Sequence, residues 1–213
     1  MNSVEGESLS TANHPWRIRR ARTDDARAVA RIYAPYVERT AITFDETAPA
    51  EEDFARKIAS TERVHPFLVA EDDSGAVVGY AYASAFKERA AYAHSVEVSV
   101  YCDMASRGRG LGSALYAALE GVLRIQGVYN ANACITAPAG PDDRVDDASL
   151  RFHSSRGYRM VGTFHSCGYK FNRWYDVAWM EKMLGEHPGV PAPFRPMSSL
   201  GADEVDEAIS HSR

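Results

Sequence analysis

Residues 95–123 read SVEVSVYCDMASRGRGLGSALYAALEGVL, and this stretch decides the fold. Its first residues alternate, with Val96, Val98 and Val100 on one face and polar side chains on the other, as in a half-buried strand. The glycine-rich segment 107–113 follows, and apolar residues then recur at helical spacing. A glycine-rich turn that enters a helix presents backbone N–H groups and the positive end of the helix dipole. We therefore expect an anion-binding site here, for a phosphate or a pyrophosphate.

Two common phosphate-binding motifs do not match this segment. A P-loop carries a lysine directly after its last glycine, and none follows these glycines. The dinucleotide fingerprint has the spacing GxGxxG near the start of a βαβ unit, whereas this segment has the spacing GxGxG in mid-chain. The pattern from Arg107 to Gly112, directly after a VxVY-type strand, instead resembles the acetyl-CoA loop of the GNAT superfamily of N-acetyltransferases. An ordinary glycine-rich turn between a strand and a helix is the alternative.

The composition narrows the class of protein. The chain has 213 residues, a net charge of −5 and 45% hydrophobic residues, which suits one globular domain. The acidic balance argues against broad nucleic-acid binding, and no apolar run approaches the roughly 18 residues that span a membrane. Three cysteines, far apart and without metal-binding spacing, are typical of reduced structural thiols. We expect a cytoplasmic protein that binds no metal, no nucleic acid and no membrane.

The remaining patterns predict an α+β fold, with a mixed, mostly antiparallel central sheet and helices on both faces. Alternation and buried-type apolar runs predict strands at 16–21, 67–71, 76–86, 95–102, 129–136, 158–165 and 170–183. One-sided apolar stripes and capping residues predict helices at about 23–37, 51–63, 111–123 and 147–156. We expect a flexible leader at 1–15, the folded domain at 16–184, and a weakly ordered, proline-containing extension at 185–213.

Several further stretches carry a closer resemblance. They are ITFD at 42–45, HPFLVAE at 65–71, VVGYAYASAFKERAAY at 77–92, RFHSSRGY at 151–158 and GTFHSCGYKFNRWYDV at 162–177. Over roughly residues 17–183 the chain resembles the phosphinothricin acetyltransferase family, which includes acetyltransferases for methionine sulfone and methionine sulfoximine. The resemblance implies a GNAT fold, acetyl-CoA as the acetyl donor, and a homodimer. It also implies direct transfer of the acetyl group, in a ternary complex, to the primary amine of a small amino acid or analogue.

The glycine-rich segment would hold the acetyl donor. Backbone N–H groups of Gly108–Ser113 would wrap the pyrophosphate, and the resemblance adds the backbone of Val100–Cys102 for the pantetheine arm. Asp146 stands where the family usually has an asparagine that contacts pantetheine, after a loop at 137–146 that is longer than usual. An aspartate cannot donate that hydrogen bond. The predicted cofactor-binding residues are Val100, Tyr101, Cys102, Arg107, Gly108, Arg109, Gly110, Leu111, Gly112, Ser113 and Asp146.

Two residues are candidates for catalysis. A substrate amine is mostly protonated at neutral pH, so a carboxylate must remove a proton, directly or through a water molecule. Glu97 lies on the polar face of its strand and matches the family's [AV]-E-x-[ST]-V-Y motif, which implies the role of general base; a surface salt bridge is the alternative. The family also carries a histidine at the position of His153, assigned to catalysis or to substrate contact. An exposed helix histidine is the alternative there.

The substrate side of the site rests on four further residues. An amino acid with a carboxylate and a sulfone, sulfoximine or phosphinate group suits binding by basic side chains. Lys87 and Arg89 match a basic pair in the family's corresponding turn, although a solvated charged turn would look the same. Phe44 and Tyr92 would wall the pocket, and both are equally consistent with core packing.

Two other functions stay open at this point. The same fold would serve an acetyltransferase for another amine, such as a polyamine, an antibiotic or a peptide N-terminus. The departure at Asp146 would also suit a catalytically weak sensor that binds coenzyme A.

Overall fold

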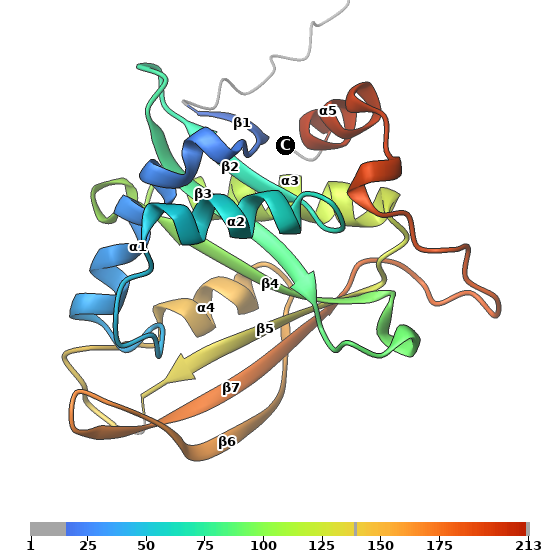
Figure 1. Cartoon of the computed structure of the whole chain (residues 1–213). Coiled ribbons are helices and arrows are strands. Elements are labelled where there is room, and N and C mark those ends of the chain that lie inside the picture. The colour runs from blue at the N-terminus through green and yellow to red at the C-terminus, as the bar shows by residue number, and fades with distance from the viewer. Residues whose placement is uncertain (1–15, 139, 212–213) are drawn as a thin grey trace, which may run out of the picture.

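The computed structural model describes residues 16–138 and 140–211, so the predicted leader at 1–15 lies outside the described residues. A seven-stranded sheet with the order β1-β2-β3-β4-β5-β7-β6 runs through the molecule (Figure 1). Its pairings are antiparallel except between β4 and β5. The strands are β1 (Arg17–Arg20), β2 (Phe67–Glu71), β3 (Val77–Ala85), β4 (Ser95–Cys102), β5 (Asn130–Ala137), β6 (Arg159–Lys170) and β7 (Arg173–Met183).

Helices cover both faces of this sheet, as the sequence predicted. They are α1 (Ala26–Arg39), α2 (Glu51–Thr61), α3 (Leu111–Ile125), α4 (Ala148–Ser155) and α5 (Ala202–His211). β2 shows why the FLVA run is continuously apolar. Phe67 and Val69 pack with α1 and α2, whereas Leu68 and Ala70 pack with α3 on the opposite face. A strand that is buried on both sides has no polar alternation.

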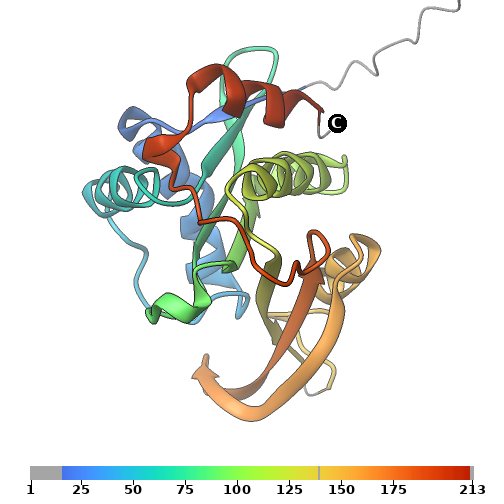
Figure 2. The ribbon, with the colours of Figure 1, turned by 90° about the vertical axis from the view of Figure 1, so that its right-hand side faces the viewer.

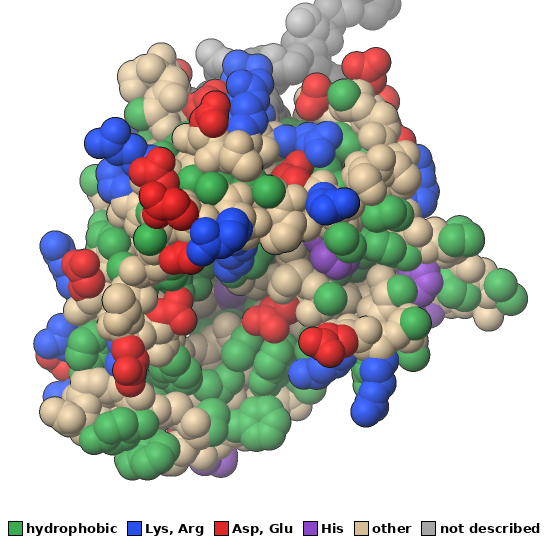
Figure 3. All heavy atoms as spheres, viewed as in Figure 1, with side chains coloured by type: hydrophobic (Ala, Val, Ile, Leu, Met, Phe, Trp, Pro, Cys, Tyr) green, Lys and Arg blue, Asp and Glu red, His purple; other side chains and the backbone are tan. Residues whose placement is uncertain are grey.

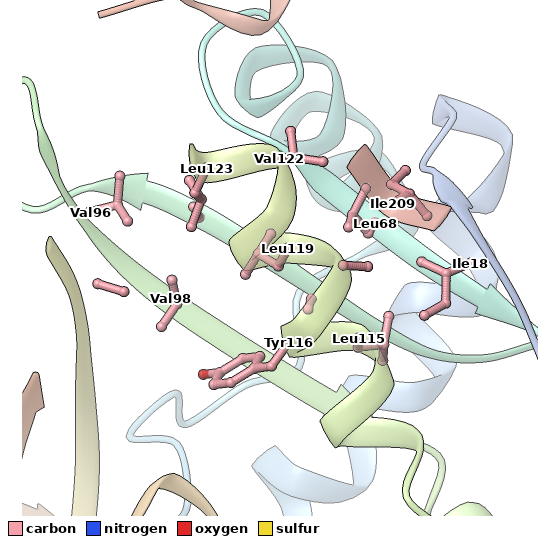
Figure 4. Close-up of a cluster of buried hydrophobic side chains, with 14 of the residues drawn as sticks. Ile18, Leu68, Val96, Val98, Leu115, Tyr116, Leu119, Val122, Leu123 and Ile209 are labelled. Atoms are coloured by element: carbon pink, nitrogen blue, oxygen red, sulfur yellow. The ribbon is translucent and has the colours of Figure 1, made fainter. Parts of the chain in front are cut away.

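Residues 95–123 supply much of the larger hydrophobic core. Leu115, Leu119 and Leu123 of α3 are fully buried against the sheet, together with Val96 and Val98 of β4 (Figure 4). Their spacing places them on one stripe of the helix, which is the apolar face read from the sequence. The strand, the glycine loop and the helix are therefore fixed to one another by packing.

The C-terminal segment differs from the expectation of weak order. After β7 the chain crosses to α5, which lies beside α3 (Figure 2). Val205 and Ile209 of α5 are buried in the same core cluster as Met197. Gln126 at the end of α3 donates to Arg195 O at 2.9 Å. The prolines and acidic residues of this segment led to the prediction of weak order, whereas the structure has a short amphipathic helix there.

A close contact joins β6 to the segment after α1. Gly168 lies on β6 where the strand register shifts, and a Cβ atom there would overlap the Phe44 ring. Phe44 itself packs among Ala41, Val145 and Tyr175. The glycine is required because the ring occupies the space of a side chain.

Replacing Gly168 by alanine should lower the free energy of unfolding by about 1–3 kcal/mol, the usual cost of overpacking. Denaturant titration at a fixed protein concentration measures it. Gly162→Ala is the matched control, because it lies on the same strand with no atom within 4 Å of the added Cβ. An equal loss in both variants would contradict the account of this contact.

Candidate active site

β4 and β5 run side by side only at their start. The last of their three parallel pairs joins Glu97 to Asn132. Beyond that pair a cavity of about 60 Å³ lies between residues 98–101 of β4 and residues 133–136 of β5. Glu97 is therefore located where the sheet opens.

The backbone of β4 presents hydrogen-bonding groups to this opening. At the start of the strand, Phe86 N donates to Ser95 O across the β3–β4 pairing. Backbone groups of a strand alternate between its two neighbours, so the odd-numbered residues of β4 face β3. Val98 and Val100 therefore face the opening. An extended chain placed there would pair with β4 as an additional strand.

Tyr36 of α1 connects the end of β4 to the glycine loop. Its hydroxyl donates to Cys102 O at 2.6 Å and accepts from Cys102 N at 3.2 Å. The Arg107 guanidinium lies 4.8 Å above the Tyr36 ring. Because Tyr36 engages the backbone N–H of Cys102, Val100 is the predicted pantetheine contact whose backbone faces the opening. The Tyr101 ring packs against Tyr33 and Tyr36 instead.

The glycine loop and the first turn of α3 line a cavity of about 450 Å³. Gly108 and Gly110 have φ angles of +74° and +84°, which residues with a side chain rarely adopt. Gly110 is the N-cap of α3, and its carbonyl accepts from Ala114 N. The N–H groups of residues 111–113 have no intrahelical partner and lie at the positive end of the helix dipole. This cavity therefore has the donors that a pyrophosphate requires.

The two arginines of the loop point in different directions. Arg107 lines the 450 Å³ cavity, whereas the Arg109 guanidinium lies 5.5 Å above the Trp16 ring. Of the two, Arg107 is placed to meet a bound anion.

Asp146 lines the same cavity from the start of α4. Its Oδ1 accepts from Ala148 N at 2.9 Å, so the carboxylate pairs with the first N–H group of α4. The preceding loop is attached to the domain by Arg173, which donates to Asp142 Oδ2 at 2.9 Å, and by Ala41 N, which donates to Arg144 O. Residues 142–144 of the longer loop are thus fixed in place, and Asp146 contributes an acceptor where an asparagine would offer a donor.

Glu97 is half-buried between its strand neighbours Ser84 and Asn132. Burial raises the pKa of its carboxyl group, and the ammonium groups of Lys87 and Lys57 oppose part of that rise. Among the described residues, none of the ion pairs involves Glu97. The surface salt bridge that was the alternative reading is therefore absent from residues 16–138 and 140–211.

His153 is buried on the α4 side of the opening, with 5% of its surface exposed. Its Nδ1 lies 2.7 Å from Ser149 O, which only accepts, so Nδ1 carries the proton of the neutral ring. Nε2 then accepts from the Tyr116 hydroxyl at 3.0 Å. Burial lowers the pKa of His153 and favours this neutral form. The histidine is thus an engaged wall residue, and the alternative of an exposed helix histidine is wrong.

The predicted substrate residues separate into two groups. Lys87 and Tyr92 line an open pocket of about 740 Å³ that also includes Asn132, the strand partner of Glu97. Arg89 is exposed in the same turn. Phe44 lies in the small core cluster against Gly168, so for this residue the core-packing alternative describes its contacts.

Comparison with known proteins decides the family. The model of the "Acetyltransferase (GNAT) domain" family matches residues 18–179. The chain belongs to the GNAT acetyltransferase family. The predicted fold class is confirmed, and the chain is an acetyl-CoA-dependent N-acetyltransferase.

Named relatives confirm the closer resemblance as well. An N-acetyltransferase of Streptomyces griseus is 37% identical over 79% of this chain and 87% of its own length. A phosphinothricin N-acetyltransferase of Streptomyces coelicolor is 35% identical over 76% of this chain and 92% of its own. A GNAT superfamily phosphinothricin acetyltransferase of Sinorhizobium meliloti, solved with acetyl-CoA, superposes with a TM-score of 0.75 at 33% identity, covering 86% and 94% of the two chains.

This GNAT acetyltransferase has a site that fits acetyl-CoA. The 450 Å³ cavity offers first-turn N–H groups for the pyrophosphate, and it adjoins the open side of β4. Within the described residues no group of three or more His, Cys, Asp and Glu side chains is arranged to hold a metal ion. The same described residues contain no helix of the length and apolarity that crossing a membrane requires.

Three site residues escaped the sequence reading. Tyr36 lies on the buried face of α1, and Tyr116 lies on that of α3. Ser149 lines both cavities at the opening. The hydroxyl groups of Tyr36 and Tyr116 form hydrogen bonds with residues distant in sequence. The pattern of residues within one helix therefore does not indicate their roles.

Proposed function

We propose that this N-acetyltransferase acetylates the primary amine of a small amino acid or analogue, of the phosphinothricin, methionine sulfone or methionine sulfoximine type. The observation that carries the proposal is the position of Glu97. It lies where β4 and β5 part, between the opening for the donor and the pocket lined by Lys87. The names of the relatives support the acceptor class, since they include a methionine sulfoximine and methionine sulfone acetyltransferase of Salmonella typhimurium at 32% identity.

In the proposed reaction acetyl-CoA supplies the acetyl group as a thioester. Glu97 takes the proton that the amine loses, directly or through a water molecule, and burial helps by raising its pKa toward that of a useful base. Backbone groups of Val98 and Val100 hold the donor arm. The new N–C bond forms as the C–S bond breaks, the departing sulfur takes up the second proton that the nitrogen loses, and coenzyme A leaves as the thiol.

The two cysteines that line the cavities at the opening, Cys102 and Cys134, support direct transfer. Burial raises the pKa of Cys102 to about 11, and that of Cys134 to about 11. A thiol in this state is protonated at neutral pH and is a poor nucleophile. We therefore propose that the acetyl group passes to the amine without an acetyl-cysteine stage.

For the remaining predicted residues we propose supporting roles. Lys87 would receive the acceptor's carboxylate from the pocket wall, with Tyr92 beside it. His153 would hold the Tyr116 hydroxyl in place at the donor opening. Arg89 would assist Lys87 in binding the acceptor, because it is exposed in the same turn and its side chain can reorient.

We further propose that the enzyme is a cytoplasmic homodimer. Hydrophobic side chains gather over the lower edge of the molecule, where β6 and β7 run (Figure 3). Val161, Phe164 and Trp174 are each more than 60% exposed there. A second copy on this face would also cover the pocket lined by Lys87, because Val161 and Phe164 line it too. The three free cysteines support a reducing compartment.

Light scattering should therefore give a mass of twice 23.5 kDa. Phe164→Glu should convert the protein to a monomer, since a charge in an apolar interface is costly to bury. Val190→Glu is the control, because Val190 is also exposed, at 88%, but lies outside β6. A monomeric wild type, or a dimer that persists in Phe164→Glu, would contradict the proposal.

A thiol-release screen tests the proposed activity. Phosphinothricin, methionine sulfone, methionine sulfoximine and ordinary amino acids are offered with acetyl-CoA, beside polyamines and a peptide N-terminus. We expect turnover with members of the first group and an N-acetylated product by mass spectrometry. Preference for a polyamine or a peptide would contradict the proposed acceptor class and would indicate an acetyltransferase for another amine. Acetyl-CoA binding without turnover of any amine would favour the sensor.

A further inference from the structure

α2 contributes a cation to the face of the sheet that carries Glu97. The Lys57 Nζ atom donates to the Tyr82 hydroxyl at 2.7 Å and lies 4.0 Å from the centre of the Tyr82 ring. Lys57 and Tyr82 are both half-buried. Among the described residues no carboxylate lies within ion-pair distance of Lys57, so its charge is held in place but not neutralised.

The sheet register sets Tyr82 beside the catalytic region. Tyr82 of β3 pairs with Ser99, and Ser84, on the same face, pairs with Glu97. Diagonal neighbours across a pair of strands are about 7–8 Å apart, which is within reach of long side chains. Lys57 also acts on the carboxyl group of Glu97 by its charge, lowering a pKa that burial raises. The Lys57 ammonium group and the Glu97 carboxyl group thus lie toward the same region of the sheet face.

A cavity of about 160 Å³ lies beside Lys57, with aromatic walls that include Tyr80 and Tyr82. Two carboxylates also line it. Asp53 forms an ion pair with Arg56, and Asp45 Oδ2 accepts from the uncharged Tyr33 hydroxyl at 2.8 Å. Lys57 is the one basic side chain among the described residues that line this cavity, so a ligand's anionic oxygen would meet its ammonium group.

We propose that this cavity receives the side-chain end of the acceptor, and that Lys57 binds an anionic oxygen on it, so that the enzyme prefers acceptors with an anionic side chain over neutral ones of similar shape. The inference rests on the proposed function, and it narrows the acceptor class to the phosphinate or carboxylate type. Lys87 would then take the α-carboxylate in the other pocket, with the amine between them at Glu97. A phosphinate oxygen would displace no ion pair of Lys57. Its hydrogen bond to the ammonium group would be charge-assisted, because both groups are ionised.

The test compares kcat/KM for phosphinothricin, whose side chain is anionic, with kcat/KM for methionine sulfone, whose side chain is neutral. Lys57→Met should lower the value for phosphinothricin at least tenfold and change that for methionine sulfone less than threefold. Lys57→Arg should restore part of the preference. Arg63→Met is the control, since Arg63 is exposed just beyond α2 and its loss also removes one positive charge.

The decisive quantity is the ratio of kcat/KM for phosphinothricin to kcat/KM for methionine sulfone. Any effect of Lys57 on Glu97 changes both kcat/KM values together and leaves this ratio unchanged. Equal losses for both acceptors in Lys57→Met, or no loss for phosphinothricin, would overturn the inference while methionine sulfone turnover upholds the proposed function. A wild type that prefers methionine sulfone would overturn it too. A wild type that acetylates neither acceptor would overturn the proposed function and this inference together.

Discussion

Replacing Glu97 by glutamine should lower kcat by about 10²–10³-fold, since a positioned general base contributes 10²–10⁴-fold. The substitution keeps the shape of the side chain and removes its ability to accept a proton as a carboxylate. Acetyl-CoA should bind with unchanged affinity, because Glu97 lies outside the cavity formed by the glycine loop. Steady-state thiol release and calorimetry measure these two quantities.

The pH profile gives an independent check of this base. The carboxylate is the active form, so wild-type kcat/KM should rise with pH through the pKa of Glu97, which burial places above the ordinary glutamate value. That inflection should disappear in the Glu97→Gln variant. Glu181→Gln is the informative control, because Glu181 pairs with Asn132 and lines the same pocket as Lys87. Loss of the inflection in Glu181→Gln, with retention in Glu97→Gln, would transfer the role of base to Glu181.

Replacing Gly110 by aspartate should weaken acetyl-CoA binding about 100-fold, or about 2.7 kcal/mol. The new carboxylate would stand at the N-terminus of α3, in the cavity that we assign to the pyrophosphate, and would repel it. It would also strain a backbone with φ of +84°.

Gly75→Asp separates the two causes. Gly75 has φ of +80° and, like Gly110, no atom within 4 Å of an added Cβ, but it lies in the β2–β3 turn. Both variants should lose similar stability in a thermal melt, and only Gly110→Asp should lose affinity for acetyl-CoA. Equal affinities in the two variants would show that the glycine loop is not the pyrophosphate site.

The sequence predicted the elements that rest on local physics. The strand, loop and helix of residues 95–123 were readable because alternation, glycines and helical spacing follow one another without a gap. The place of Glu97 on β4 could be predicted from the alternation of the strand, and its role as general base stays a prediction from the family's motif. The anion site needed only the known properties of glycine and of a helix N-terminus.

The parts that escaped prediction depend on contacts between distant segments. His153 was weighed as an exposed helix residue, whereas Tyr116 and the Ser149 carbonyl engage both of its ring nitrogens. Lys57 was not singled out from the sequence, because its contact with the Tyr82 hydroxyl joins residues 25 positions apart. Composition at 185–213 hid α5, because a ten-residue helix is stabilised by packing more than by its own sequence.

The central claim is that the acetyl group passes directly from acetyl-CoA to an amine at the opening between β4 and β5. A rapid-quench experiment with acetyl-labelled acetyl-CoA tests it. Without acceptor, the protein should carry no label. With acceptor, free thiol and N-acetylated product should appear together in a ratio of one to one. Label bound to Cys102 or Cys134 before the acceptor is added, or thiol release without N-acetylated product, would contradict the claim.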